Sequence, residues 1–322
     1  MKVVKPGYEI ILNTLDPVTK IERVARVCYK SESKIKEGSA EKLVSALIKR
    51  GHEAMLEHAS FCFELDGESY LWLTTCVQCL QDTTNFKSYL TVSADGRLLV
   101  SGNVRAWRSF LLACVEIYKF FPEFIKQFIF SNPVLFPELQ DENMFAECEG
   151  VMIPITDDQL RTKNEKLKHF RPTVQFIVDR GVSHEIVRHR AASFAQESTR
   201  YCNYMKDDFG GEIAVIKPFY LEEGTIGYSI WEDACRSAET AYFDLLNWGC
   251  TAQEARGVLP THLKTEVVMT APLSEWVHFF NLRALGTTGA PHPQMKEVAE
   301  PLLEAVKTDW LDFDYAEGKD NG

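Results

Sequence analysis

Apolar residues recur at helical spacing in several separate stretches of the chain and alternate with polar residues in others. In residues 15–29, for example, Ile21, Val24 and Val27 share one helical face. The helices predicted in this way cover residues 15–29, 41–50, 183–190, 228–248, 252–257, 274–284 and 293–308. Strands are predicted at residues 58–65, 174–178 and 212–216. Ser183 is the expected N-cap of the helix that would run through Arg190.

Residues 66–171 follow no single period. Asp66 and Gly67 predict a turn, and residues 98–108 begin like a strand. Residues 107–130 are rich in apolar and aromatic side chains and favour a helix. Residues 138–168 are polar and acidic, and we expect them to be mobile.

Composition indicates a folded, reduced protein. The 322 residues are 45% hydrophobic, which is enough for a substantial core. The sequence has no run of eighteen apolar residues and begins without an apolar signal core, so we expect neither a membrane span nor export. Nine scattered cysteines favour a reduced cytoplasmic setting. The lone pair Cys76 and Cys79 has no second pair at zinc-ligand spacing, so buried structural thiols are the better interpretation.

One short segment, residues 188–201, has the composition of an anion-binding site. It contains the arginines Arg188, Arg190 and Arg200, the hydroxyls Ser193, Ser198 and Thr199, and the imidazole of His189. Arginine binds phosphate bidentately and keeps its charge, and hydroxyls donate to the same oxygens. Because the whole chain carries a formal charge of −11, we expect a discrete phosphorylated molecule here and no nucleic acid.

Residues 188–201 also have interpretations other than an anion-binding site. Arginines at a helix end can simply complement the helix dipole or form surface ion pairs. His184 and His189 resemble a zinc-protease motif, but they lie five residues apart and so leave one helical face, which excludes that metal site. Ser198 with His189 could form a hydrolase pair, but no nucleophile elbow surrounds the serine. Glycine-rich phosphate loops do not occur in the sequence.

Several separated motifs together resemble the flavin-dependent thymidylate synthases. That family has the signature Arg-His-Arg, seven residues, then Ser, and Arg188-His189-Arg190 with Ser198 match it. The other similar motifs are Ala25–Tyr29, Gly51–His58, Ala255–Pro260 and Trp276–Arg283, in the order that the family has them. The resemblance covers about 1–65 and 172–310.

The resemblance implies an enzyme that converts dUMP to dTMP. The one-carbon unit would come from methylenetetrahydrofolate, and FAD reduced by NADPH would supply the hydride. The cysteine-dependent synthases use a Pro-Cys dipeptide, which does not occur in this sequence. The alternatives left open are flavin-dependent modification of another pyrimidine nucleotide and a non-catalytic nucleotide-binding protein.

The resemblance also implies a role for each matching residue. FAD would be contacted by Arg188, His189, Arg190, Gln196 and His278. The nucleotide would be contacted by Glu185, Arg188, Gln196, Glu197, Ser198, Thr199, Arg200, Arg256, Leu282 and Arg283. Three of the matching residues, Arg283, His52 and Ser198, are the expected catalytic residues. Arg283 would stabilise the deprotonated pyrimidine N3, because a fixed guanidinium lowers the cost of a developing anion.

The chain departs from the family's usual residues at Ala195 and Gln196 and at two positions before His278. Members often carry Asn-x-Arg, contacting the FAD adenine, where this sequence has Pro272 and Ser274. We hypothesise that Asn103 and Arg105 replace that contact. The test is the FAD affinity of the Arg105→Ala variant. Unaltered FAD binding in this variant would reject the hypothesis.

The family fold implies an α+β architecture, a central and largely antiparallel sheet packed by helices. We expect a single catalytic domain over residues 1–322, with a long, partly helical insertion at about 66–171. The resemblance also implies a homotetramer with active sites shared between subunits.

Overall fold

A four-stranded antiparallel sheet forms the centre of the molecule, and the structure is a computed structural model that describes residues 1–83, 90–206 and 210–311. Its strand order is β10-β12-β9-β2. The strands are β2 (Gly7–Ile11), β9 (Thr173–Asp179), β10 (Ser193–Gln196) and β12 (Lys264–Thr270). The prediction of an α+β fold around a largely antiparallel sheet is therefore confirmed.

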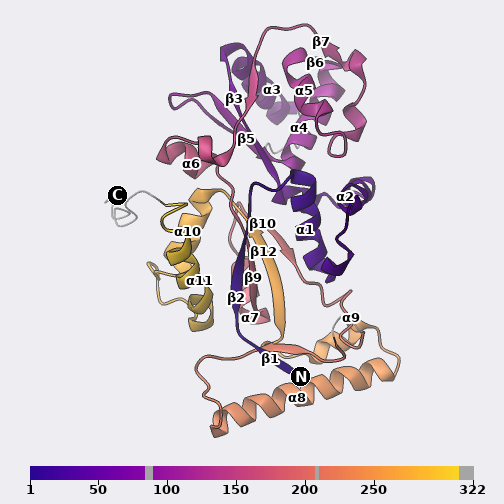
Figure 1. Ribbon diagram of the computed structural model, residues 1–322, viewed down its shortest axis with the longest axis vertical. Coiled ribbons are helices and arrows are strands. Elements are labelled where there is room, and N and C mark those ends of the chain that lie inside the picture. Colours follow the sequence, from indigo (N-terminus) through magenta and orange to yellow (C-terminus); the bar gives the residue numbers. More distant parts are fainter. Residues whose placement is uncertain (84–89, 207–209, 312–322) are drawn as a thin grey trace.

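Helices cover both faces of this central sheet (Figure 1). They are α1 (Pro17–Tyr29) and α2 (Ser39–Lys49) on one side and α10 (Leu273–Arg283) and α11 (Pro293–Val306) on the other. Trp276 and Phe279 of α10 pack on Phe176 of β9, all three fully buried. Val24 of α1 packs on the opposite face with Val268 of β12. The helical periods read from the sequence thus point at the two faces of one sheet.

A second four-stranded antiparallel sheet, of order β4-β5-β3-β8, lies at the upper end of the molecule in Figure 1. Its strands are β3 (Ser60–Leu65), β4 (Thr91–Ser93), β5 (Leu99–Asn103) and β8 (Met152–Pro154). The helices around it are α3 (Gly67–Thr83), α4 (Val104–Tyr118) and α5 (Lys126–Phe130). Phe63, Trp107, Phe110 and Phe128 join these elements in a core of their own.

Several predictions for residues 66–171 were wrong. Asp66 and Gly67 form no isolated turn, because the Asp66 carboxylate accepts from the amide of Ser69 and a helix starts at Gly67. The helical stretch 107–130 is broken by the short strand β6 (Phe121–Pro122), which pairs with β7 (Phe145–Ala146).

Residues 138–168 also differ from the prediction of a mobile segment. They contain β7, β8 and most of α6 (Lys163–His169), and they bury Leu139, Leu160 and Glu165. Their polar side chains have partners: Glu165, for example, pairs with Arg97. A polar composition here reflects a shell over the upper core and does not indicate a loss of order.

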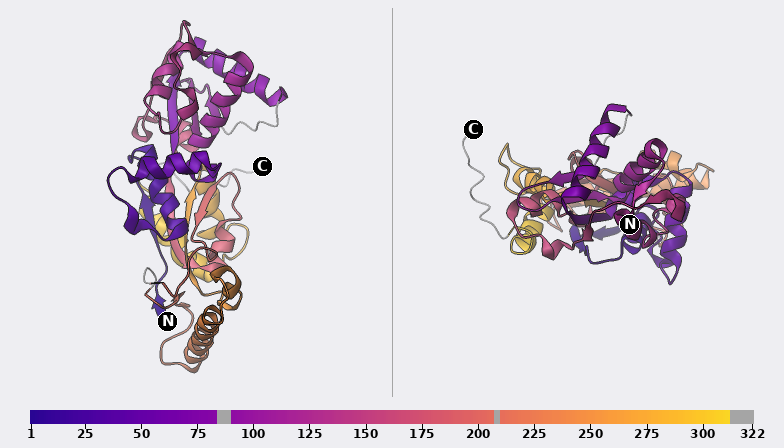
Figure 2. Two further views of the ribbon diagram at one scale, coloured as in Figure 1. Left: turned by 90° about the vertical axis from the view of Figure 1, so that its right-hand side faces the viewer. Right: turned by 90° about the horizontal axis from the view of Figure 1, so that it is seen from above.

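The lower end of the molecule in Figure 1 is built by the long helix α8 (Ile226–Asn247), which gives the molecule its elongated outline in Figure 2. The strand β1 (Lys2–Val4) pairs in parallel with β11 (Ala214–Ile216) beside it. Cys235 and Tyr242 are the buried residues of α8, whereas Ile226 and Ile230 are exposed. The sequence predicted this helix and its end at Gly249, but not how much of its surface remains open.

Candidate functional site

The helix before the basic segment is shorter than predicted. The Asp179 carboxylate, at the end of β9, accepts a 2.7 Å hydrogen bond from the amide of Val182 and caps α7 (Arg180–Ile186). Ser183, the predicted N-cap, lies inside the helix and donates to the Arg180 carbonyl. Residues 188–190 consequently lie outside any helix, and Ala191 follows with a φ of 52°. These arginines therefore follow the helix and do not belong to its last turn.

Three of the predicted site residues meet at the end of α10. Arg283 Nη1 donates to Glu185 Oε2 at 2.6 Å, and Arg283 Nε donates to His189 Nε2 at 3.1 Å. Arg283 Nη2 also donates to the Glu185 carbonyl at 3.2 Å. A guanidinium held by a carboxylate and an imidazole is fixed in direction as well as position.

The imidazole of His189 is held in its neutral form. Burial, followed by the positive charge of Arg283, lowers the pKa of His189 to about 4. Because Nε2 accepts from Arg283, the proton of the neutral ring is on Nδ1. The ring lies 5.9 Å from that of His278, another predicted site residue, which is exposed.

A second group of predicted residues gathers where β10 ends. Arg256 donates to Thr199 Oγ1 at 3.3 Å, and the amide of Arg200 donates to Ser198 Oγ at 3.3 Å. Arg256 comes from the helical turn after α9 (Ala252–Ala255), more than fifty residues further along the chain. Arg200 and Arg256 are exposed, so their guanidinium groups are accessible to a ligand. This pairing of arginines and hydroxyls suits a phosphate.

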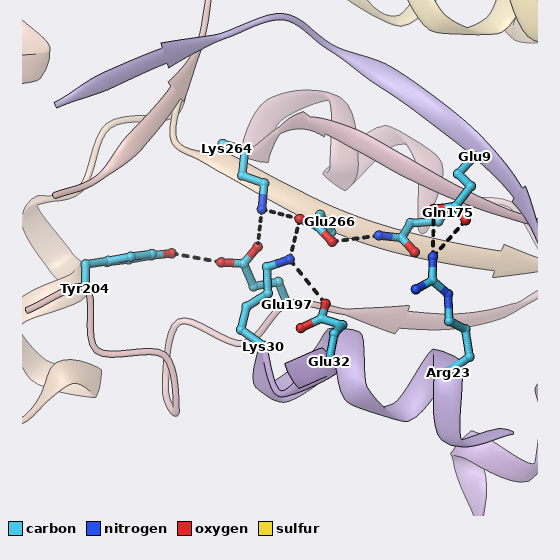
Figure 3. Close-up of polar contacts among 9 residues, drawn as sticks. All are labelled: Glu9, Arg23, Lys30, Glu32, Gln175, Glu197, Tyr204, Lys264 and Glu266. Carbon is cyan, nitrogen blue, oxygen red and sulfur yellow. Dashed lines mark hydrogen bonds and ion pairs between the residues drawn. The ribbon is translucent and has the colours of Figure 1, made fainter. Parts of the chain in front are cut away.

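Glu197 is not where sequence reasoning put it. It was predicted to line the nucleotide, but it is 3% exposed, and its carboxylate accepts a hydrogen bond of 3.1 Å from Lys264 Nζ. Figure 3 shows Lys264 between Glu197 and Glu266, with Lys30 bonded to the same oxygen of Glu266 as Lys264. Glu197 stands in sequence among residues that are predicted to bind the nucleotide. Its buried contact with Lys264 could therefore not be recognised from the sequence. Lys264 and Glu266 were missed, although a charged pair within a strand of apolar residues was the available signal.

These buried charges balance one another. Burial opposes the ionised form of Glu266, but the contacts with Lys264 and Lys30 outweigh it and lower the pKa of Glu266. Burial likewise opposes the charge on Lys30, and the bond to Glu266 raises the pKa of Lys30. The network ties the residue just before Ser198 to the central sheet and so fixes the start of the loop that carries Ser198, Thr199 and Arg200.

Gln196 also points inward. Its Nε2 donates to Ser183 Oγ at 2.8 Å and to Thr265 Oγ1 at 3.3 Å. The side chain therefore connects β10 to α7 and to β12.

The remaining predicted residues contribute no side-chain hydrogen bond or ion pair to these groups within the described residues. Arg188 and Arg190 are exposed on the segment between α7 and β10, and the amide of Arg188 donates to the Glu185 carbonyl at 3.4 Å. Leu282 is half-buried on α10. His52 is exposed at the start of a short helical turn, Glu53–His58, which contacts β10.

A cavity of about 470 Å³ opens beside the segment that follows Arg190. Asn103 and Pro272 both line this cavity. Asn103, which is proposed to replace the FAD contact that is missing at Pro272, therefore lies in the same cavity as Pro272. Arg105 donates to Glu57 Oε1 at 2.6 Å, and Ser193 donates to Glu57 Oε2 at 2.7 Å. Glu57 and Arg171 also line the cavity, and neither was singled out from sequence.

The described residues contain neither a candidate metal centre nor a candidate membrane-spanning helix. Within residues 1–83, 90–206 and 210–311, no group of three or more His, Cys, Asp and Glu side chains is placed to hold a metal ion. In the same ranges, no helix has both the length and the apolar character that a bilayer crossing requires.

Comparison with known proteins gives several matches. A family model described as thymidylate synthase complementing protein matches residues 9–79 and 161–310. A flavin-dependent thymidylate synthase of Geobacter sulfurreducens is 34% identical over 130 residues, 40% of this chain and 53% of that protein. The enzyme of the same name from Pyrococcus furiosus is 31% identical over 124 residues, 38% of this chain and 49% of that protein. The chain thus spans about half the length of the curated relatives it matches.

Among solved structures, the chain matches a UMP/dUMP methylase, PolB, from Streptomyces cacaoi bound with 5-Br dUMP. The TM-score is 0.40 at 15% sequence identity, covering 96% of this chain and 93% of that chain.

Proposed function

Because the chain belongs to the thymidylate synthase complementing protein family, we propose that it is a flavin-dependent thymidylate synthase that converts dUMP to dTMP. The observation that carries the proposal is the convergence of Arg283, Glu185 and His189. Arg283 comes from a different sequence motif than Glu185 and His189, and a non-catalytic phosphate binder has no need of a half-buried, oriented guanidinium away from its phosphate arginines. The convergence supports a site that acts on the nucleotide base.

The proposed role of Arg283 follows from its charge and its fixation. A guanidinium facing the pyrimidine would stabilise negative charge at N3 as it develops, which activates the ring without an enzyme nucleophile. It cannot take up the proton itself, because it is always protonated. Glu185 and neutral His189 hold it in one direction, so little reorganisation is needed during the reaction.

The nucleotide phosphate would bind at the second group. Ser198, Thr199, Arg200 and Arg256 supply hydroxyl and guanidinium donors there, and the buried network behind Glu197 holds their loop. Gln196, which bonds to α7, would orient the base from β10. His52 and Leu282 would close over the base and the one-carbon donor.

The residues present fit a flavin cofactor. Arg188, His189, Arg190 and His278 would hold FAD, with exposed guanidinium groups for its phosphates and two imidazoles for its ring system. The cofactor, reduced by NADPH, would supply the hydride, and methylenetetrahydrofolate would supply the one-carbon unit. We keep Asn103 and Arg105 as proposed replacements for the contacts missing at Pro272 and Ser274.

We also propose one catalytic domain with an insertion at about 66–171, assembled as a cytoplasmic homotetramer. The family model leaves residues 80–160 unmatched, which supports the insertion. Exposed apolar side chains along and after α8, namely Ile226, Ile230 and Trp248, support contact with other subunits. Light scattering of the purified protein tests the tetramer.

The decisive experiment is anaerobic turnover with dUMP, methylenetetrahydrofolate, FAD and NADPH, with dTMP detected by mass. Product that disappears without FAD, and falls sharply in Arg283→Ala, is the expected result. Bound flavin without product would favour another pyrimidine nucleotide as substrate. A colourless, inactive protein that still binds dUMP would favour the non-catalytic nucleotide-binding alternative.

A further inference from the structure

The cavity beside Ala191 lies at the seam between the two sheets. Thr91 and Asn103 reach it from the upper sheet, and Thr270 and Pro272 reach it from the end of β12. In Figure 1 this seam lies where the upper sheet meets the upper ends of β10 and β12. The volume of about 470 Å³ is enough for part of a dinucleotide. The region 66–171 and the central sheet therefore build this cavity together.

Arg171 is the charged group in the wall of this seam cavity that has no acidic partner. Its side chain is 7% exposed, and it donates to Ser101 Oγ at 2.8 Å and to Thr91 Oγ1 at 2.9 Å. Both partners are neutral hydroxyls, and within the part of the chain that the structure describes the guanidinium forms no ion pair. Burial lowers the pKa of Arg171 to about 10, so the group stays charged at neutral pH. A buried charge of this kind is costly unless an anion pairs with it.

The hydroxyl partners cannot supply that negative charge. Ser101 Oγ accepts from Arg171, so its own hydrogen is free to donate to His169 Nδ1 at 2.8 Å. His169 Nε2 then donates to Ser93 Oγ at 2.7 Å. Burial and the charge of Arg171 lower the pKa of His169 to about 4, so this ring is neutral. The chain of contacts orients Arg171 without neutralising it.

The neighbouring acids are already engaged. Asp157 accepts from Asn13 Nδ2 at 2.8 Å, and its charge acts on two buried cations, Lys20 and Arg171. Within the described residues Asp157 forms no ion pair with either cation, so the Arg171 guanidinium is not paired with a carboxylate. Glu57, on the cavity wall, is paired with Arg105 and accepts from Ser193. The charge balance thus calls for one further anion in the cavity.

We propose that Arg171 is the anion-binding residue of the seam cavity and that it binds a phosphate group of a dinucleotide cofactor. Guanidinium, hydroxyl and amide donors converge there, which is the donor set that phosphate prefers. Flavin and nicotinamide dinucleotides share that chemistry, and the experiment below separates them. The inference rests on the proposed function in one respect, that the ligand is one of that reaction's dinucleotides.

The experiment compares the full-length wild type with Arg171→Met and Arg171→Lys. We expect inorganic phosphate to raise the thermal unfolding temperature of the wild type more than that of Arg171→Met, which keeps only the phosphate site proposed at Ser198 and Arg256. Dissociation constants are then measured for FAD, riboflavin and NADPH by fluorescence. The affinity for one dinucleotide should fall about ten- to a hundredfold in Arg171→Met, with partial recovery in Arg171→Lys and riboflavin unchanged. Which dinucleotide loses affinity identifies the ligand.

Arg97→Met is the matched control. Arg97 is an arginine of the same region whose side chain is 10% exposed, but Glu64 and Glu165 neutralise it and it does not line the cavity. Removing it should lower the unfolding temperature and leave both the phosphate effect and cofactor affinity intact. Arg171→Met without ligand should unfold no earlier than the wild type, because it removes an uncompensated charge.

Two results would overturn the inference. One is that phosphate, FAD and NADPH all act on Arg171→Met as on the wild type. The other is that Arg171→Met is destabilised as much as Arg97→Met while phosphate protects it as strongly as the wild type, which makes Arg171 a purely structural residue. A protein that forms no dTMP but is protected less by phosphate in Arg171→Met would reject the proposed function and keep this inference.

Discussion

Arg283 and Glu185 are 98 positions apart in the chain, yet the guanidinium donates to the carboxylate at 2.6 Å. Arg283 ends α10 and Glu185 lies in the last turn of α7, so the pair joins the two helices that flank the basic segment. His189 Nε2 accepts from the same guanidinium. The contacts with Glu185 and His189 therefore fix the orientation of the Arg283 guanidinium.

Weakening this pair should slow the reaction without unfolding the protein. In Glu185→Gln the charge is lost but the shape remains, so Arg283 is held less firmly. We expect kcat/KM for dUMP to fall roughly ten- to a hundredfold, the loss of one charged hydrogen bond. Steady-state kinetics measure this. Glu300→Gln, which removes a surface pair with Lys296, should leave kcat/KM unchanged.

Acid should release Arg283 through His189. The pKa of His189 is about 4 in the folded protein, against an ordinary value of about 6.5 in the unfolded chain. Between these values the unfolded chain binds a proton that the folded protein does not, so stability falls as pH drops from 6.5 toward 4 and is full above 6.5. The ring of the folded protein is protonated only as the pH approaches 4, and a protonated ring can no longer accept from Arg283, so dUMP affinity should weaken there.

A variant isolates this effect from other titrations. The amide oxygen of His189→Gln can accept from Arg283 and does not titrate. Binding titrations at pH 7 and pH 4 should therefore show a smaller loss of dUMP affinity in the variant than in the wild type. Equal losses in both proteins would assign the pH dependence to other groups, among them the phosphate of dUMP.

Breaking the buried network behind the phosphate loop should cost stability. Lys264→Met leaves the Glu197 carboxylate buried without its ammonium partner, which we expect to lower the free energy of unfolding by roughly 3 kcal/mol. Urea unfolding measures the change. Lys296→Met removes only an exposed ion pair and should stay within about 0.5 kcal/mol of the wild type. A similar change in both variants would show that the network adds nothing beyond a surface pair.

Arg256 should matter for the nucleotide and not for the fold. It is exposed and donates to Thr199, so Arg256→Ala removes a phosphate donor without opening the core. We expect a roughly tenfold to hundredfold weaker Kd for dUMP and an unchanged affinity for deoxyuridine, which lacks the phosphate. Arg236→Ala, on the exposed face of α8, is the matched control. Equal losses for dUMP and deoxyuridine would place Arg256 away from the phosphate.

Helices were predictable from the sequence because each buries one face. The periods in residues 15–29 and 274–284 correspond to α1 and α10 within a few residues. The central strand β12 was missed, because Lys264–Thr270 is buried on both faces over most of its length and so has no alternation. Strand β10 was also missed, because its four residues are too few to show a period.

The site was only partly predictable for a related reason. Motif spacing identified Arg283, Glu185 and His189, which meet in space, and Arg256 with Thr199, which also meet. No sequence pattern tells a ligand-facing acid from a buried one, so Glu197 was assigned to the nucleotide although Lys264 holds it. Charge compensation depends on the folded surroundings, and the position of Arg171 became informative only with its neighbours.

The pairing of β2 with β9 and of β9 with β12 has a consequence for synthesis on the ribosome. Gly7 pairs with Ile177, and Thr173 pairs with Thr270, so the central sheet cannot close until the late part of the chain has emerged. The upper sheet uses strands only from residues 60–154, so it can form first. We expect the amino-terminal strand to remain unpaired until β9 has emerged, which makes residues 7–11 a binding target for chaperones during that time.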